Sequence, residues 1–203
     1  MDSPTPDDTT QNLARSAQEG DAKRFAELCE RVAPALIAWC ELKVSGPLRD
    51  NVDPLDIVQE TWCRAWRKFP HYNADTTPFR AWTFKIAKNV VLECLRSARR
   101  QYGTPEGGSA SRGELAQSAI DSATALSRRL AREESIVEML HWARGLDVEE
   151  YALFMHIGLE GLSYTQAGER LGLEKDTVAK RWQDLRARAA RASRGVDYYL
   201  ADS

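Results

Sequence analysis

The sequence predicts an all-α protein made of two small helical domains joined by a flexible linker. Apolar residues recur at the three- and four-residue spacing of helices along most of the chain. Sustained alternation of apolar and polar residues is missing, as are Asn-Gly or Asp-Gly hairpin turns between apolar runs. Residues 101–128 are instead rich in Gly, Ser and Ala, without a steady apolar stripe, which indicates a linker. With 43% hydrophobic residues among 203, the chain can fill one or two cores.

The first domain is expected at residues 12–100, behind an N-terminal tail of residues 1–11. Asp53-Pro54 and Thr77-Pro78 each put a capping side chain before a proline at the first helical position. Gly20-Asp21 ends one helix and caps the next, and Pro34 is expected to start a further helical stretch. The expected helices span residues 8–19, 21–33, 35–44, 53–69 and 78–100.

The second domain is expected at residues 129–194, before a C-terminal tail of residues 195–203. Gly145, Gly161 and Gly172 separate its apolar-periodic segments. The expected helices span residues 130–144, 148–158, 164–171 and 174–192.

Motifs for catalysis and metal binding are missing from the sequence. The four cysteines form no CxxC pair, and His71, His141 and His156 share no metal-ligand spacing. There is no nucleophile motif and no phosphate-cradling glycine loop. We therefore expect no catalytic residue, no metal and no cofactor, and an enzyme is the weakest class of function.

Two further features of the sequence predict a cytoplasmic protein that does not insert into a membrane. No apolar run approaches the roughly 20 residues that cross a bilayer. The start, MDSPTPDDTT, lacks the basic and then apolar layout of a signal peptide.

Charge is distributed unevenly behind a net charge of -2. Positions 51–100 carry 9 basic and 5 acidic residues, whereas positions 131–160 carry 2 and 7. Because the chain as a whole is not basic, any contact with nucleic acid must come from local stripes of cations.

The helix expected at 53–69 carries an acidic edge beside its buried stripe. Asp56, Gln59 and Glu60 lie in its first turns and its basic residues in the last, which is the order that the helix dipole favours. The pattern is most often that of a solvated amphipathic face, and an acidic docking edge for a partner protein is the alternative.

The helix expected at 78–100 carries a polar stripe that is separate from its apolar face. Cations bind phosphates and aromatic rings stack on unpaired bases, so the stripe suits nucleic acid, although a solvated face has the same pattern. The loop from His71 to Thr77 adds small polar groups that can hydrogen-bond a base edge. The stripe comprises Lys85, Lys88, Asn89, Arg96, Arg99 and Arg100.

Residues 162–188 have the pattern of a helix-turn-helix motif. Ser163 and Gln166 form a capping box, and Gly172 makes the turn. Gly168 is expected where two helices cross closely, and Val178 anchors the second helix in the core. A helical hairpin with a polar face is the alternative. The outward residues near the start of the second helix, where base edges are read, are Lys175, Thr177, Lys180, Arg181, Gln183 and Asp184; Arg186 and Arg188 suit phosphates.

With these motifs in this order, the chain resembles sigma-70 family RNA polymerase sigma factors of the extracytoplasmic function (ECF) group. The segment DPLDIVQETWCRAWRKF is similar to the family's region 2.2, and TPFRAWTFKIAKNVVLECLRSARR to regions 2.3 and 2.4. The segment GLEGLSYTQAGERLGLEKDTVAKRWQDLRAR is similar to region 4.2. The resemblance implies a sigma-2 domain at 12–100 and a sigma-4 domain at 129–194.

The resemblance also implies partners for the three surfaces. Asp56, Gln59 and Glu60 would face the β′ clamp helices of bacterial core RNA polymerase, and helix 148–158 would rest on the β-flap. The second helix of the motif would read duplex DNA at the minus-35 element. The residues implied to bind single-stranded non-template DNA at the minus-10 element are His71, Asn73, Asp75, Thr76, Thr77, Arg80, Lys85, Lys88, Asn89, Arg96, Arg99 and Arg100.

The resemblance also bears on a possible regulator of this chain and on the glycine inside its helix-turn-helix motif. An anti-sigma factor that clamps the two domains is common among its members. Gly168 stands where the family usually has alanine, and a glycine inside a helix costs about 1 kcal/mol, so we expect a weaker first helix in the motif. An ordinary helix-turn-helix repressor or activator is the alternative function; it would lack a polymerase dock and a single-strand pocket.

Overall fold

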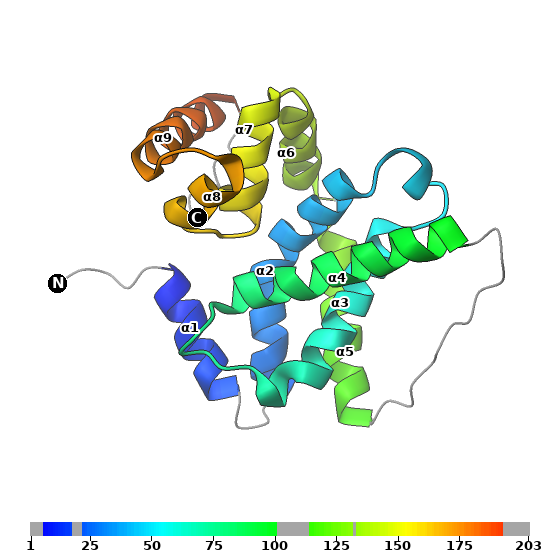
Figure 1. The fold of residues 1–203 in the computed structure, drawn as a ribbon. Coiled ribbons are helices and arrows are strands. Elements are labelled where there is room, and N and C mark those ends of the chain that lie inside the picture. The colour runs from blue at the N-terminus through cyan, green and yellow to red at the C-terminus, as the bar shows by residue number, and fades with distance from the viewer. Residues whose placement is uncertain (1–5, 18–21, 101–113, 132, 193–203) are drawn as a thin grey trace.

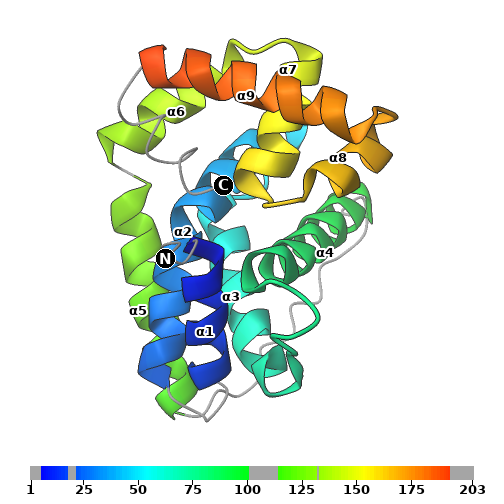
Figure 2. The same ribbon diagram turned by 90° about the vertical axis from the view of Figure 1, so that its left-hand side faces the viewer.

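In the computed structural model, the described part of the chain, residues 6–17, 22–100, 114–131 and 133–192, contains helices and no strand. Two helical units contact each other (Figure 1), the first formed by α1 to α5 and the second by α6 to α9. In both views the second unit lies across one end of α2 (Figure 2). The all-α prediction is confirmed.

The first unit packs around aromatic side chains. Its first helices are α1 (Pro6–Ala17), α2 (Ala22–Lys43), α3 (Pro54–Lys68) and α4 (Phe79–Arg100), with short 3₁₀ turns at Gly46–Leu48 and Phe69–His71. Phe25 is fully buried and meets the rings of Trp66 and Phe69 edge-on, with centroids 4.9 and 5.0 Å apart. This packing joins α2 to α3 and fixes the direction in which α4 leaves the loop after Phe69.

Helix α2 runs without a break through Pro34, so the prediction of a new helix starting there was wrong. Proline removes one hydrogen bond from a helix interior, at a cost of about 3 kcal/mol or more. On both sides of Pro34, however, Val32, Ala33, Ala35 and Leu36 are buried in the core. This burial on two faces stabilises the continuous helix.

Residues 114–128, which were expected to be linker, form most of helix α5 (Glu114–Leu130), which packs against α2 and α3. Ile120 and Ala123 are buried, and Trp62 donates its indole N–H to the buried Ser127 hydroxyl, 3.3 Å away. Small residues let α5 lie close to the other helices, and the same small residues produced the linker-like composition. The rest of the expected linker, 101–113, lies outside the described residues. So do residues 1–5 of the expected N-terminal tail, residues 193–194 at the end of the expected second domain, and the whole expected C-terminal tail, 195–203.

The second unit contains α6 (Glu134–Arg144), α7 (Val148–Leu153), α8 (Tyr164–Leu171) and α9 (Lys175–Ala192). After α7 the chain continues as a π-helical turn, η3 (Phe154–Leu159), in which Glu160 N–H donates to the Met155 carbonyl. Val178, Trp182 and Leu185 of α9 fill the core of this unit. Helices α3, α4, α8 and α9 agree with their predicted bounds to within one residue.

Candidate functional site

The acidic edge on α3 is present at the surface of the first unit. The Asp53 side chain caps α3 by accepting from the Leu55 N–H, at 2.8 Å, and Pro54 follows it. Asp56 is exposed, whereas Gln59 and Glu60 are half-buried. Asp56 is therefore the most accessible carboxylate of the predicted set.

Glu60 takes part in a chain of ion pairs that continues onto α4. Arg64 lies 2.7 Å from Glu60 and 2.6 Å from Glu93, so its guanidinium joins the two helices. The hydrogen bond from Arg64 holds the pKa of Glu93 below its usual range. These side chains and Asp56 line a hollow of about 360 Å³ between α3 and α4. Sequence reasoning missed Glu93, because its partner is far away in the sequence.

The loop from His71 to Thr77 is held in shape by its own polar groups. The Asn73 carboxamide oxygen accepts from the Asp75 N–H at 2.8 Å, which is an Asx turn. The Tyr72 hydroxyl donates to the Thr77 carbonyl at 2.7 Å. Asp75 pairs with Arg15 of α1 at 2.9 Å, a contact that the sequence did not predict. The ion pair with α1 thus holds the loop in place. His71 and Thr76 of the loop are exposed.

The α4 residues that were predicted to bind the minus-10 strand, which are Arg80 and the polar stripe, divide into two groups. Lys85, Asn89 and Arg96 are exposed, but Arg80 and Lys88 are half-buried and contact the second unit. Arg80 donates to the carbonyls of Leu159, at 2.8 Å, and of Gly158. Arg99 and Arg100 belong to α4, but their side chains lie outside the described residues.

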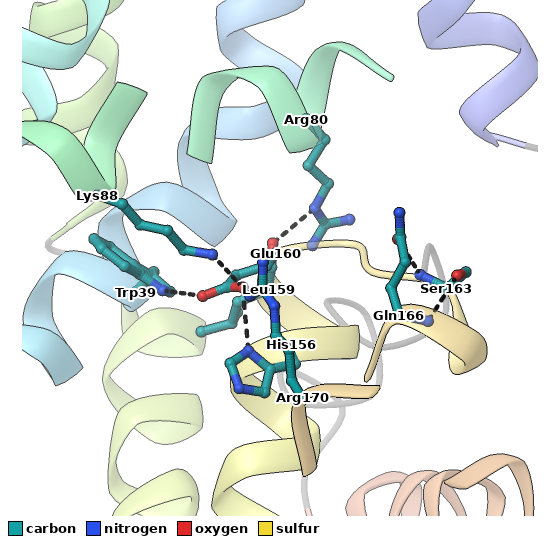
Figure 3. A network of polar contacts seen from close by, with 9 residues as sticks. All are labelled: Trp39, Arg80, Lys88, His156, Leu159, Glu160, Ser163, Gln166 and Arg170. Carbon is teal, nitrogen blue, oxygen red and sulfur yellow. Dashed lines mark hydrogen bonds and ion pairs between the residues drawn. The ribbon is translucent and has the colours of Figure 1, made fainter. Parts of the chain in front are cut away.

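Lys88 binds Glu160, a carboxylate with 1% of its surface exposed (Figure 3). The distances to the two carboxylate oxygens are 2.6 Å from Lys88 Nζ, 3.0 Å from Trp39 Nε1, 3.1 Å from His156 Nδ1 and 3.0 Å from Arg170 Nη1. Although burial raises the pKa, hydrogen bonds from His156 and Lys88 outweigh it and lower the pKa of Glu160 to about 2. The sequence did not predict this cluster. Its one local signal is Glu160 itself, a single acidic residue at the end of an apolar run.

The helix-turn-helix geometry of α8 and α9 agrees with its sequence pattern. Ser163 and Gln166 form both bonds of the capping box, at 3.2 and 3.1 Å, and Gly172 ends α8 at a φ of 67°. Gly168 lies where the helices cross, because a Cβ there would stand 2.5 Å from the Leu173 carbonyl oxygen. The crossing leaves no room for the Cβ of the alanine that the family usually has here, so glycine fits this position despite its low helix propensity.

Helix α9 presents a polar face to solvent beside its buried stripe. Arg181 and Arg188 form ion pairs with Glu149 and Glu150 of α7. In contrast to the two arginines, Lys180 is exposed and forms no ion pair with any described residue. Among the predicted residues, the exposed ones are Lys175, Thr177, Lys180, Gln183, Asp184 and Arg188, and the half-buried ones are Arg181 and Arg186.

The apolar residues of 148–158 lie in the interior of the second unit. Leu153, Phe154, Met155 and Ile157 are all buried, whereas Val148 at the start of α7 is 87% exposed. The segment is therefore most accessible to a partner at its exposed start.

The loop of the first unit and the motif of the second unit face one hollow of about 720 Å³. Thr76, Thr77 and Arg80 line it from one side, and Ser163 and Lys175 from the other. The two predicted DNA-binding surfaces are thus close together in this arrangement.

Neither a metal site nor a membrane span is found in the described part of the chain. No three His, Cys, Asp or Glu side chains there gather around a point that could hold a metal ion. No helix among the described residues is both long and apolar enough to cross a bilayer.

Comparison with known proteins identifies the family. Residues 28–101, from α2 to the end of α4, match sigma-70 region 2. The ECF RNA polymerase sigma factor SigL of Mycobacterium tuberculosis is 31% identical over 157 residues, covering 72% of this chain and 77% of that protein. The chain belongs to the ECF sigma factor family. This sigma factor binds core RNA polymerase and promoter DNA, and it directs transcription initiation.

A further relative of this sigma factor matches most of the chain. The RNA polymerase sigma factor CnrH of Cupriavidus metallidurans is 27% identical over 186 residues, 90% of this chain and 93% of that protein. A solved structure of CnrH in complex with the cytosolic domain of CnrY covers 95% of this chain and 98% of that chain, with 25% identity and a TM-score of 0.42.

Proposed function

We propose that three surfaces of this sigma factor divide the work of initiation. The acidic edge of α3 docks on core polymerase, the 71–77 loop with α4 holds the melted minus-10 strand, and α9 reads the minus-35 duplex. The observation that carries the proposal is the helix-turn-helix of α8 and α9, with an exposed polar face on α9, in a chain that matches sigma-70 region 2. The sigma-2 and sigma-4 functions then belong to the first and second units.

The proposed polymerase dock rests on Asp56, with Gln59 and Glu60 beside it. Carboxylates steer a basic partner by charge complementarity, and the β′ clamp helices are the proposed partner. Glu60 is already bonded to Arg64, so Asp56 offers the most accessible charge. Any contact with the β-flap would be made at Val148, the exposed start of α7.

Charge reversal tests the dock. Asp56→Lys should weaken binding to core polymerase roughly tenfold, because it puts a like charge against the basic partner. Asp50→Lys, an exposed change of the same kind just before the helix, is the control and should bind normally. Equal affinity of the Asp56 variant and the control in a fluorescence titration would remove Asp56 from the dock.

The proposed minus-10 surface uses the exposed groups of α4 and the loop. Lys85 and Arg96 neutralise phosphates, while Asn73 and Asn89 lie where an amide can meet a base edge. Taking a base out of the stack costs a few kcal/mol, which contacts in the open complex offset. Arg80 and Lys88 join this surface once their contacts with the second unit open.

We also propose that the factor supplies no catalytic chemistry of its own and acts in the cytoplasm, where the polymerase works. The resemblance to the family further suggests an anti-sigma factor as a regulator. Such a partner would hold the two units and keep them from polymerase.

Run-off transcription with bacterial core polymerase and a library of promoter DNA tests the whole proposal. Specific start sites that depend on the added factor are expected, and they reveal both promoter elements. Duplex binding without any start site would favour the alternative, a helix-turn-helix regulator that acts without polymerase. The observation that supports this alternative is the helix-turn-helix geometry of α8 and α9, which by itself fits any protein that binds duplex DNA.

A further inference from the structure

The contact between the two units occupies cations that the proposed minus-10 surface needs. Lys88 Nζ lies 2.6 Å from Glu160, and Arg80 donates to the carbonyls of Leu159 and Gly158. Both cations belong to α4, whereas all three acceptors belong to the second unit (Figure 3). An ammonium group bonded to a buried carboxylate cannot neutralise a phosphate at the same time, so the two uses of Lys88 exclude each other.

Glu160 has partners on both sides of this contact. Trp39 and Lys88 come from the first unit, and His156 and Arg170 come from its own unit. A buried carboxylate is costly unless it is paired, so the four donors stabilise the closed contact. If the units separate, His156 and Arg170 still pair with Glu160 while water reaches it. The Glu160 carboxylate therefore has hydrogen-bond and charge partners in both the closed and the open arrangement.

The closed arrangement cannot serve both promoter elements. The minus-35 and minus-10 elements are about 25 base pairs apart, which is about 85 Å of duplex at 3.4 Å per pair. Here, Thr76 and Thr77 of the loop and Lys175 at the start of α9 line one hollow. The units must move apart before the factor can contact both elements.

We propose that Glu160 is an intramolecular competitor of DNA: it holds the free factor closed by binding Lys88, and the non-template strand takes its place when the units separate. The competition with DNA rests on the proposed minus-10 role of Lys88. The closed contact between Lys88 and Glu160 is independent of that role. DNA that binds only the open state shifts the population toward it. The apparent affinity for DNA is lowered by the fraction of factor that is closed.

The closed contact is tested on the full chain by acetylating lysines and measuring each rate by mass spectrometry. Lys85 is exposed on the same helix and serves as the internal reference for Lys88. Glu160→Gln should speed acetylation of Lys88 roughly fivefold or more, the lower end of typical couplings between sites. It should also increase the radius of gyration in small-angle X-ray scattering. Glu133→Gln, which removes an exposed carboxylate of the second unit, should change neither quantity.

Two results would overturn the closed contact. One is a wild-type Lys88 that reacts as fast as Lys85. The other is a folded Glu160→Gln variant with unchanged Lys88 rate and radius of gyration. If circular dichroism shows that Glu160→Gln does not fold, Arg80→Ala opens the contact from α4 and should raise the same two quantities. An unchanged, folded Arg80→Ala variant would then overturn it.

Competition with DNA is tested with a fluorescent 12-nucleotide single strand of random sequence, because phosphate contacts do not require the promoter sequence. Glu160→Gln should bind this strand roughly fivefold more tightly than Glu133→Gln, which has the same net charge. The competition would be overturned if Glu160→Gln and Glu133→Gln bind the strand with equal affinity although acetylation and scattering show that Glu160→Gln is open. If adding Lys88→Ala to Glu160→Gln leaves the affinity unchanged, the minus-10 role of Lys88 fails and the competition with it, while the acetylation rates still report the closed contact.

Discussion

A single glycine shows how packing reverses a local preference. Alanine is favoured over glycine inside a helix by about 1 kcal/mol. At Gly168, however, a Cβ would stand 2.5 Å from the Leu173 carbonyl oxygen, which belongs to the turn between α8 and α9. The backbone of the turn would have to move, and overpacking of this kind costs about 1–3 kcal/mol.

Gly168→Ala should therefore lower the free energy of unfolding by about 1–3 kcal/mol in a urea titration. Gly145→Ala is the matched control, because Gly145 has a φ of -87° and a Cβ there would stand 3.4 Å from the Trp142 carbonyl oxygen, its nearest contact. The control should change stability little. A more stable Gly168→Ala protein would show that the crossing has room for a methyl group.

Glu160 makes stability depend on pH in the acid range. Its pKa is lowered to about 2 in the folded protein, so the folded state favours the charged carboxylate. The resulting stabilisation is fully present above the ordinary glutamate pKa and is lost as the pH falls from there to about 2. The difference in stability between wild type and Glu160→Gln should shrink over that interval in thermal melts. A difference that is constant from pH 6 to pH 2 would contradict the lowered pKa.

At the scale of elements, α5 is part of the first unit. Ile120 of α5 is 2% exposed. Ile120→Ala should lower the free energy of unfolding by about 2–4 kcal/mol, because it leaves a cavity. Val137→Ala, at a position 55% exposed on α6, is the control and should cost less than about 0.5 kcal/mol. Equal small losses in urea titrations would mean that α5 is not docked in solution.

Two neighbouring cations of α9, Lys180 and Arg181, differ in how available they are to DNA. Lys180 is exposed, whereas Arg181 pairs with Glu149. Lys180→Ala should weaken binding to a promoter duplex several-fold and lower the salt slope by about one, and Arg181→Ala should do less. Glu149→Gln releases Arg181 and should tighten binding. Fluorescence titrations at two salt concentrations measure these effects, and a larger loss for Arg181→Ala would reverse the assignment.

At the scale of the whole molecule, the closed arrangement limits what the free factor can contact. Its two proposed DNA surfaces share one hollow, while the promoter elements are about 85 Å apart. In hydroxyl-radical footprints, the free factor should protect at most one element, and the holoenzyme should protect both. Protection of both elements by the free factor would show that it opens without polymerase.

Local patterns in the sequence determined the helical class, the start of α3 at Asp53-Pro54 and the capping box at Ser163 and Gln166, because each depends on residues within one or two turns. The motifs also led to the family. Only the tertiary structure decided that α2 continues through Pro34 and that α5 packs as a helix, because burial from distant segments outweighs local preference. It alone joined Lys88 to Glu160, since a contact across 72 positions leaves no periodic signal in the sequence.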